Sequence, residues 1–184
     1  MKHFFTILIV GVFYGCAVLG SKTTYKSNIK FEFKKIGCAK LFNSKEFNAA
    51  TFDVNSILFR FLKKEYLYNL GDTILFIDRD INFNFPSKED IIDICLNNNL
   101  NGLMLPKMKL IRTTEKMYGV TIAEYFNTEV QLKLYDNNGN LIISTLHNTQ
   151  KGNTYFKAPK LENTIYDGAT GALQKLLKEY HLLK

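Results

Sequence analysis

Two carboxylates flank a guanidinium in the segment FIDRDIN, where Asp78, Arg79 and Asp80 follow a short apolar run. Charged side chains at the carboxyl end of a central strand are typical of ligand sites in α/β proteins. The same side chains also fit a surface ion-pair cluster at the point where a strand leaves the core. We favour the surface cluster and keep a small-ligand site, or an enzyme active site, at these three residues as the alternative.

The histidines form no catalytic constellation in the sequence. His147 falls in an expected strand and His181 lies near the carboxyl terminus, and neither has a neighbouring nucleophile along the chain. The segment DGATG, residues 167–171, matches neither of the glycine-rich phosphate-binding motifs. Its small residues instead predict a helix that approaches a sheet closely. The sequence therefore predicts a non-catalytic protein without a cofactor.

Two of the three cysteines, Cys38 and Cys95, lie in apolar stretches. No CxxC pair and no cysteine–histidine spacing of the kind that binds metals occurs, so no metal site is predicted. We favour buried free thiols for both residues, since a free cysteine behaves as a small core residue. A disulfide between them in an oxidising compartment is the alternative.

The chain starts with the layout of an export signal. A positively charged start is followed by the apolar run FFTILIVGVFYG, residues 4–15, which has the length of a signal-peptide core. Counted on to Leu19, the run is slightly shorter than the ~17–25 residues that span a bilayer as a helix. Ordinary secretion and an uncleaved membrane anchor are the alternatives to cleavage directly before Cys16.

Cys16 stands between a glycine and an alanine, and this stretch resembles the lipobox of bacterial lipoproteins. Phe13 and Tyr14 occupy the positions where that motif usually has leucine and a small residue. The resemblance implies that residues 1–15 are a signal peptide and that Cys16 becomes the lipid-bearing first residue. Residues 16–28 are small and polar, and they predict a lipidated tether between the membrane and the domain.

Residues 29–184 predict a single globular domain of the α/β (α+β) class, with helices packed on one mixed sheet. Apolar residues alternate in the expected strands and recur at helical spacing in the expected helices. Pro106 cannot donate to a ladder, so its strand is expected at a sheet edge or at a bulge. The expected elements are a strand at 29–41, a helix at 52–65, a central strand at 73–78, a helix starting at 87, a strand at 103–111, a hairpin at 128–152 and a helix at 160–184.

Residues 112–127 are polar and without clear periodicity, so we expect a loop around Gly119. Tyr118 and Tyr125 lie in this segment, and exposed aromatic residues are common in partner-binding surfaces. An edge strand is a second route to a partner, because its unpaired backbone groups accept an added strand. These tyrosines are the candidate contacts for a protein partner.

The charge distribution argues against nucleic acid as a partner. Lysine and arginine number 24 against 17 acidic residues, for a net charge of +7. Nucleic-acid-binding proteins concentrate such charge in a basic patch. The longest basic clusters here are pairs, Lys34 with Lys35 and Lys63 with Lys64, so the charges predict a solvated surface.

The element order behind a lipobox-like signal resembles a group of bacterial envelope domains. The group includes the amino-terminal domain of the Tol-system propeller protein, the curli-secretion lipoprotein and the lipoprotein activators of penicillin-binding proteins. The resemblance is carried by TILFIDRD with the following helix and GLMLPKMKL, and by EVQLKLYDNNGNLIIS followed by IYDGATGALQKLLKEY. It implies a periplasm-facing interaction or assembly module, anchored in the outer membrane through Cys16, with an envelope protein as partner.

Overall fold

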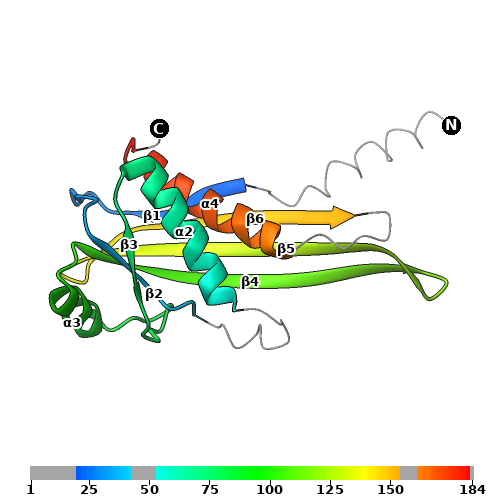
Figure 1. Ribbon diagram of the computed structural model, residues 1–184, viewed down its shortest axis with the longest axis horizontal. Helices are drawn as coiled ribbons and strands as arrows, with labels where there is room; N and C mark the ends of the chain where they lie inside the picture. The colour runs from blue at the N-terminus through cyan, green and yellow to red at the C-terminus, as the bar shows by residue number, and fades with distance from the viewer. Residues whose placement is uncertain (1–19, 43–52, 154–160, 183–184) are drawn as a thin grey trace, which may run out of the picture.

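The computed structural model describes residues 20–42, 53–153 and 161–182, which form one mixed sheet with helices packed on it (Figure 1). The sheet has six strands in the order β1-β6-β5-β4-β2-β3. This confirms the expected α+β class and the single mixed sheet. The elements are β1 Gly20–Lys26, β2 Ile36–Ala39, α2 Val54–Leu70, β3 Ile74–Ile77, α3 Lys88–Asn98, β4 Gly102–Met117, β5 Val120–Asp136, β6 Leu141–Asn153 and α4 Leu161–Glu179.

The centre of the sheet is an antiparallel meander of β4, β5 and β6. β2 pairs in parallel with both β3 and β4, while β1 pairs antiparallel with β6 at the opposite edge. The expected hairpin at 128–152 is confirmed, and its turn lies at Asp136–Gly139, where the Gly139 N–H donates to the Asp136 carbonyl at 3.0 Å. Gly139 has φ 73°, a conformation that glycine adopts without a steric cost.

Both faces of the sheet are covered near its β2–β3 side. Along β4 the side chains alternate between faces, as strand geometry requires. Met104 and Met108 join the core formed with α2 and α4, whereas Leu103 and Leu105 join a second core with α3. The helices therefore lie in separate layers, with α2 and α4 on one face and α3 on the other.

Small residues let α4 lie close to β5 and β6. A Cβ on Gly168 would be 2.6 Å from the Val130 Cγ2, and one on Gly171 would be 2.4 Å from the His147 ring. Ala169 and Ala172 are fully buried beside them. The sequence-based expectation of a closely packed terminal helix is thus confirmed.

The sheet begins earlier in the chain than the sequence indicated. Residues 20–26, expected to belong to the tether at 16–28, form strand β1 and pair with β6 from Gly20↔Asn148 to Lys26↔Ile143. The tether prediction is wrong for these residues. β1 is an edge strand with mostly exposed side chains, so it lacks the apolar alternation by which half-buried strands are recognised.

The strand expected at 29–41 is confined to Ile36–Ala39. The alternation upstream comes from Phe31 and Phe33, whose rings pack edge-to-face on each other with centroids 5.0 Å apart and lie against the border of the core. They are anchored by ring contacts and have no strand pairing. Their spacing imitated a strand because each ring is half-buried while its neighbours are exposed.

The strand expected at the centre of the sheet is instead an edge strand. β3 pairs only with β2, and its Leu75 and Phe76 are exposed. Ile74 and Ile77 enter the cores on opposite faces of the sheet. A short apolar run therefore did not distinguish this edge strand, of which only the end residues are buried, from a central one.

β4, the strand that contains Pro106, lies between β5 and β2. It is therefore an interior strand and does not lie at the sheet edge, where the proline led us to expect it. The Pro106 carbonyl accepts a hydrogen bond from the Phe42 N–H at 3.1 Å on the β2 side. The backbone N and O of one strand residue point to the same side, so the Pro106 nitrogen, which carries no hydrogen, also faces β2. The β2–β4 ladder ends at Met104, before Pro106, so the proline removes no hydrogen bond from that ladder.

Residues 112–127, expected to be a loop, continue β4 and β5 into a long two-stranded projection. Pairing runs without a break in strand assignment to Met117↔Val120, with one register shift between Glu115 and Lys116. The loop prediction is wrong except at the turn itself, Tyr118-Gly119. Two paired strands that no helix covers need no apolar face. Their sequence is therefore polar and lacks the alternation of apolar and polar residues by which strands are recognised.

Replacing Gly168 by alanine tests the close approach of α4. Alanine adds about 1 kcal/mol of helix propensity, while its methyl group overpacks against Val130 at a typical cost of about 1–3 kcal/mol. We expect Gly168→Ala to lower the free energy of unfolding by about 1 kcal/mol in urea denaturation. Lys178→Ala, on the exposed side of the same helix, is the control and should change it little. Equal or greater stability of Gly168→Ala would contradict this packing.

Candidate functional site

The residue expected to carry the lipid, Cys16, lies outside the described residues, as does the expected signal peptide at 1–15. β1 begins only four residues later, at Gly20. Four residues reach at most about 14 Å even when fully extended. The way in which β1 is held therefore determines how an anchor at Cys16 is connected to the domain.

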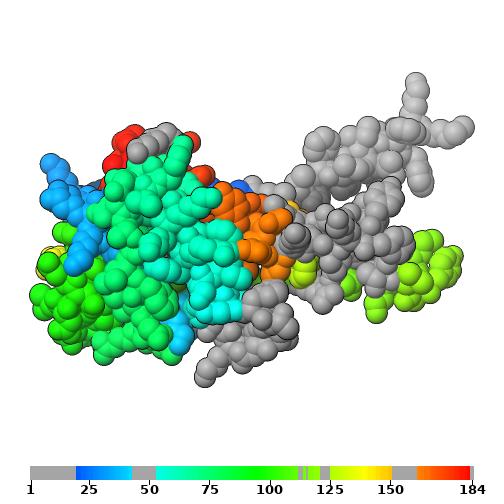
Figure 2. All heavy atoms as spheres, viewed as in Figure 1, coloured from blue at the N-terminus to red at the C-terminus, as the bar shows by residue number. Residues whose placement is uncertain are grey.

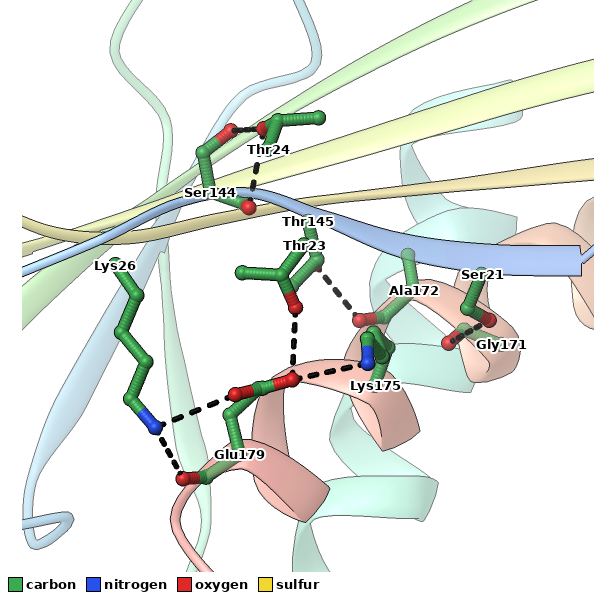
Figure 3. Close-up of polar contacts among 10 residues, drawn as sticks. All are labelled: Ser21, Thr23, Thr24, Lys26, Ser144, Thr145, Gly171, Ala172, Lys175 and Glu179. Atoms are coloured by element: carbon green, nitrogen blue, oxygen red, sulfur yellow. Dashed lines mark hydrogen bonds and ion pairs between the residues drawn. The ribbon is translucent and has the colours of Figure 1, made fainter.

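Glu179 at the end of α4 is the main polar contact of β1 (Figure 3). Its carboxylate accepts from the Thr23 hydroxyl at 3.0 Å and lies 3.3 Å from the Lys26 Nζ and 2.9 Å from the Lys175 Nζ. Lys26 also donates to the Glu179 carbonyl at 2.6 Å. The contacts of Lys175, Thr23 and Lys26 lower the pKa of Glu179 to about 2. The carboxylate therefore joins β1 to α4 in its ionised form.

A second contact joins β1, β6 and α4 at Ser21. The Ser21 hydroxyl donates to the Gly171 carbonyl at 3.0 Å, and its oxygen lies 2.6 Å from the His147 Nδ1. Because the single hydroxyl proton points at the carbonyl, the Nδ1–H of His147 is the donor to Ser21. Burial lowers the pKa of His147, with Asp167 opposing that change. In this arrangement the imidazole does not act as a base toward Ser21, and the pair serves as a structural contact.

Two further hydroxyls hold the strands around β1. Thr24 is the extra residue at the β1 irregularity between Thr23 and Tyr25, and its hydroxyl donates to Ser144 on β6. The buried Thr145 hydroxyl donates to the Ala172 carbonyl of α4 at 2.8 Å. β1 is thus attached by its ladder with β6 and by side chains that reach the helix.

The β4–β5 hairpin projects far beyond the rest of the sheet (Figures 1 and 2). β6 pairs with β5 only as far as Asn153↔Glu124, so beyond that pair the described sheet consists of two strands. We call residues 116–120 the hairpin tip. The exposed fractions of its Met117 and Val120 are 54% and 57%, and that of Tyr118 is 95%.

The backbone conformation at the hairpin tip is also unfavourable for a tyrosine. Tyr118 has φ 49° and Gly119 has φ 81°, so both central residues of the two-residue turn are left-handed. Such turns favour Asn-Gly, and a tyrosine in the left-handed region costs about 1 kcal/mol or more. Tyr125, the other candidate, lies partly buried on β5, opposite Thr113 and Gly152. Of the two candidate tyrosines, Tyr118 is the one that lies almost fully exposed, at the end of the hairpin.

The structure places Asp78, Arg79 and Asp80 on the exposed surface after the edge strand β3. The exposed fractions of the Asp78 and Asp80 side chains are 77% and 84%, and their carboxylates lie 3.6 and 3.8 Å from the Lys40 Nζ. These distances are those of surface ion pairs. Both carboxylates thus pair with Lys40, a residue that the cluster favoured from the sequence did not include.

Cys38 and Cys95 are buried free thiols, as expected. They belong to the separate cores on the two faces of the sheet. Burial raises the pKa of Cys38 to about 12 and that of Cys95 to about 11. Both thiols therefore stay protonated at neutral pH and act as core residues.

The described residues provide no grouping of three or more histidine, cysteine or acidic side chains that could hold a metal. Within the same residues, no helix has the length and apolar character needed to cross a membrane.

The fold is similar to that of solved bacterial proteins. The PelC dodecamer from Paraburkholderia phytofirmans matches with a TM-score of 0.54 and 15% identity, covering 85% of this chain and 95% of that one. A structure of a PelC variant gives a TM-score of 0.55. This likeness shows that the two chains share a fold.

Weaker matches include a minor lipoprotein and TolB, both from Acinetobacter baumannii. The minor lipoprotein has a TM-score of 0.45 and 15% identity over 84% of this chain and 96% of its own. TolB has a TM-score of 0.42 and 13% identity over 88% of this chain and 31% of its own. No protein-family model matches the sequence, and neither does any curated protein.

The sequence does not predict the contacts of β1. Thr23, Thr24 and Tyr25 are residue types that favour strands, and this was the one available signal. The partners of Ser21 and Thr23 are 150 and 156 positions away on α4, a separation that no local pattern reveals.

Glu179→Gln tests the ionised contact between α4 and β1. Because the pKa of Glu179 is about 2 in the folded protein, against 4.5 ordinarily, its contribution to stability is present above pH 4.5. It is lost as the pH falls from about 4.5 to about 2. At neutral pH we expect Glu179→Gln to lower the free energy of unfolding by about 1 kcal/mol, since the carboxylate is partly exposed.

The measurement is the unfolding midpoint of the two proteins across the acidic range. The difference between them should shrink toward zero as the pH approaches 2. A difference that does not change with pH would show that the carboxylate charge does not hold β1.

Proposed function

We propose that this protein is a non-catalytic envelope lipoprotein, anchored through Cys16 in the outer membrane and facing the periplasm, where it acts as an interaction or assembly module. The observation that carries the proposal is a lipobox-like cysteine four residues before a strand that is fixed in the sheet. An anchor at Cys16 would hold the domain within about 14 Å of the lipid headgroups. That distance suits a module that acts at the membrane surface.

The alternative function, a small-ligand-binding protein or enzyme at Asp78, Arg79 and Asp80, has less support. Two of its three side chains are highly exposed and face Lys40 at ion-pair distance. A ligand site usually gathers polar groups in a concave, mostly apolar surface. The exposed position of these carboxylates favours the interaction module.

We also propose that the protein assembles with its partner through the β3 edge of the sheet. β3 is the last strand on its side, with the exposed apolar side chains of Leu75 and Phe76. Strand addition at such an edge gains backbone hydrogen bonds and covers apolar surface. PelC, which shares the fold, is described as a dodecamer. A second copy of this chain is therefore the first partner to test.

The lipid anchor is tested by Cys16→Ser in the native type of cell. Serine has no thiol for acylation, so we expect complete loss of incorporated fatty-acid label and loss of the protein from the membrane fraction. Ala17→Ser, which changes the next residue but keeps the thiol, is the matched control. Retention of the acyl label in Cys16→Ser would refute the anchor.

Assembly is tested by sedimentation velocity of the detergent-solubilised lipoprotein. We expect an oligomer for the wild-type chain and at least a ~10-fold weaker association for Leu75→Glu, because a buried unpaired carboxylate is costly. Leu96→Glu changes an exposed leucine of α3 and should leave the oligomer intact. A monomeric wild-type chain, or equal effects of the two variants, would exclude assembly through the β3 edge.

A further inference from the structure

The start of β1 and the hairpin tip lie toward the same end of the sheet. Gly20 pairs with Asn148, Asn148 with Glu129, and Glu129 with Lys109, so these four residues lie at one level. From that level β4 runs on toward the tip. β1 runs in the opposite direction, so the chain enters β1 from the side on which the hairpin projects (Figure 1).

The distances at this end favour contact between the tip and a membrane that holds Cys16. From Lys109 to Met117 the strand advances by about eight residues, or about 26 Å. Cys16 lies at most about 14 Å from Gly20. Along the strand direction, the tip thus extends about 12 Å past the farthest position that Cys16 can reach. Amphipathic segments bury their apolar side about 5–10 Å deep in the headgroup region.

The chemistry of the tip suits lipid. Met117, Tyr118 and Val120 expose apolar surface at a narrow turn, and tyrosine is well suited to a boundary between water and hydrocarbon. The exposed Lys116 can direct its amine toward lipid phosphates while its stem follows the apolar surface. Backbone pairing continues to Met117↔Val120, which reduces the number of unpaired polar groups that would enter the membrane.

The turn conformation points to a role for the aromatic ring itself. Asparagine would fit the left-handed backbone at position 118 with less strain than tyrosine. The ring is nevertheless present and almost fully exposed, so it brings no packing gain within the described chain. Strained backbone at an exposed functional side chain is a known pattern of binding sites.

We propose that the hairpin tip, residues 116–120, inserts into the headgroup region of the same bilayer that holds the lipid on Cys16. This inference rests on the proposed anchor and adds a second membrane contact to it. A lipid chain and an apolar hairpin together hold a protein more firmly than either does alone. With two separate contacts, the domain also keeps a fixed orientation relative to the membrane.

The test uses the full lipidated chain in vesicles of phosphatidylethanolamine and phosphatidylglycerol. An environment-sensitive fluorophore is attached at Lys116→Cys, next to the apolar residues, and the native thiols Cys38 and Cys95 are buried. We expect a blue shift of its emission and quenching by spin-labelled lipids. The same fluorophore at Asn138→Cys, in the β5–β6 turn at the other end of the sheet, should remain in water and unquenched.

Two substitutions at Tyr118 separate lipid contact from folding. In the labelled chain, Tyr118→Asn should relieve the turn and keep or raise the unfolding midpoint, yet abolish most of the quenching. Tyr118→Phe should keep the quenching, because the ring remains. Equal quenching in all three proteins would overturn the role of the ring and with it the proposal.

The remaining outcomes distinguish this inference from the proposed anchor. Fatty-acid label on Cys16 together with an unquenched, water-exposed fluorophore at the tip overturns the tip contact and leaves the anchor standing. A fluorophore shielded from water but not quenched by lipid places the tip against protein and also overturns the proposal. Absence of the label on Cys16 overturns the anchor and the membrane contact together.

Discussion

The close approach of α4 to β5 and β6 is the contact on which the rest of the structure depends. Gly168 lies against Val130 and Gly171 against His147, at distances that leave no room for a Cβ. Only at this separation do the leucines of α4 fill the core beneath α2. The same separation brings Ser21 and Thr23 of β1 within hydrogen-bonding distance of the helix. One packing distance therefore sets both the core and the attachment of the first strand.

This attachment changes how the amino-terminal segment must be understood. Residues 20–26 form a strand with a six-pair ladder to β6 and an ionised contact at Glu179, where a loose tether was expected. A flexible tether would let the domain rotate freely relative to an anchor. A strand that is paired in the sheet restricts this rotation. With Cys16 as the anchor, as we propose, the orientation of the sheet relative to the membrane would be restricted by the fold itself.

Elements whose apolar side chains enter the core were predictable from the sequence, and elements without such side chains were not. α4 and the β5–β6 hairpin have strong helical and alternating patterns, and the structure confirms them. β1 has mostly exposed side chains, and the extension of β4 and β5 is a two-stranded pairing, so no hydrophobic period marks either of them. Asp78 and Asp80 were expected at the end of a central strand but follow the edge strand β3, whose short apolar run resembles that of a central strand. The contacts of Ser21 with Gly171 and His147 depend on positions far apart in the chain, and only the packed helix reveals them.

The arrangement of the strands links the two parts of our proposal. An anchor before β1 and an inserted hairpin tip would both direct the strands toward the membrane, since both lie toward the same end of the sheet. The two edges of the sheet, β1 and β3, would then face sideways along the membrane surface. Copies held on one membrane in one orientation meet edge to edge more often than copies in solution, because the anchor fixes both their height and their direction. A shared membrane would therefore strengthen the β3 edge contact that we propose, and the hairpin tip would support assembly by fixing the orientation that the edges require.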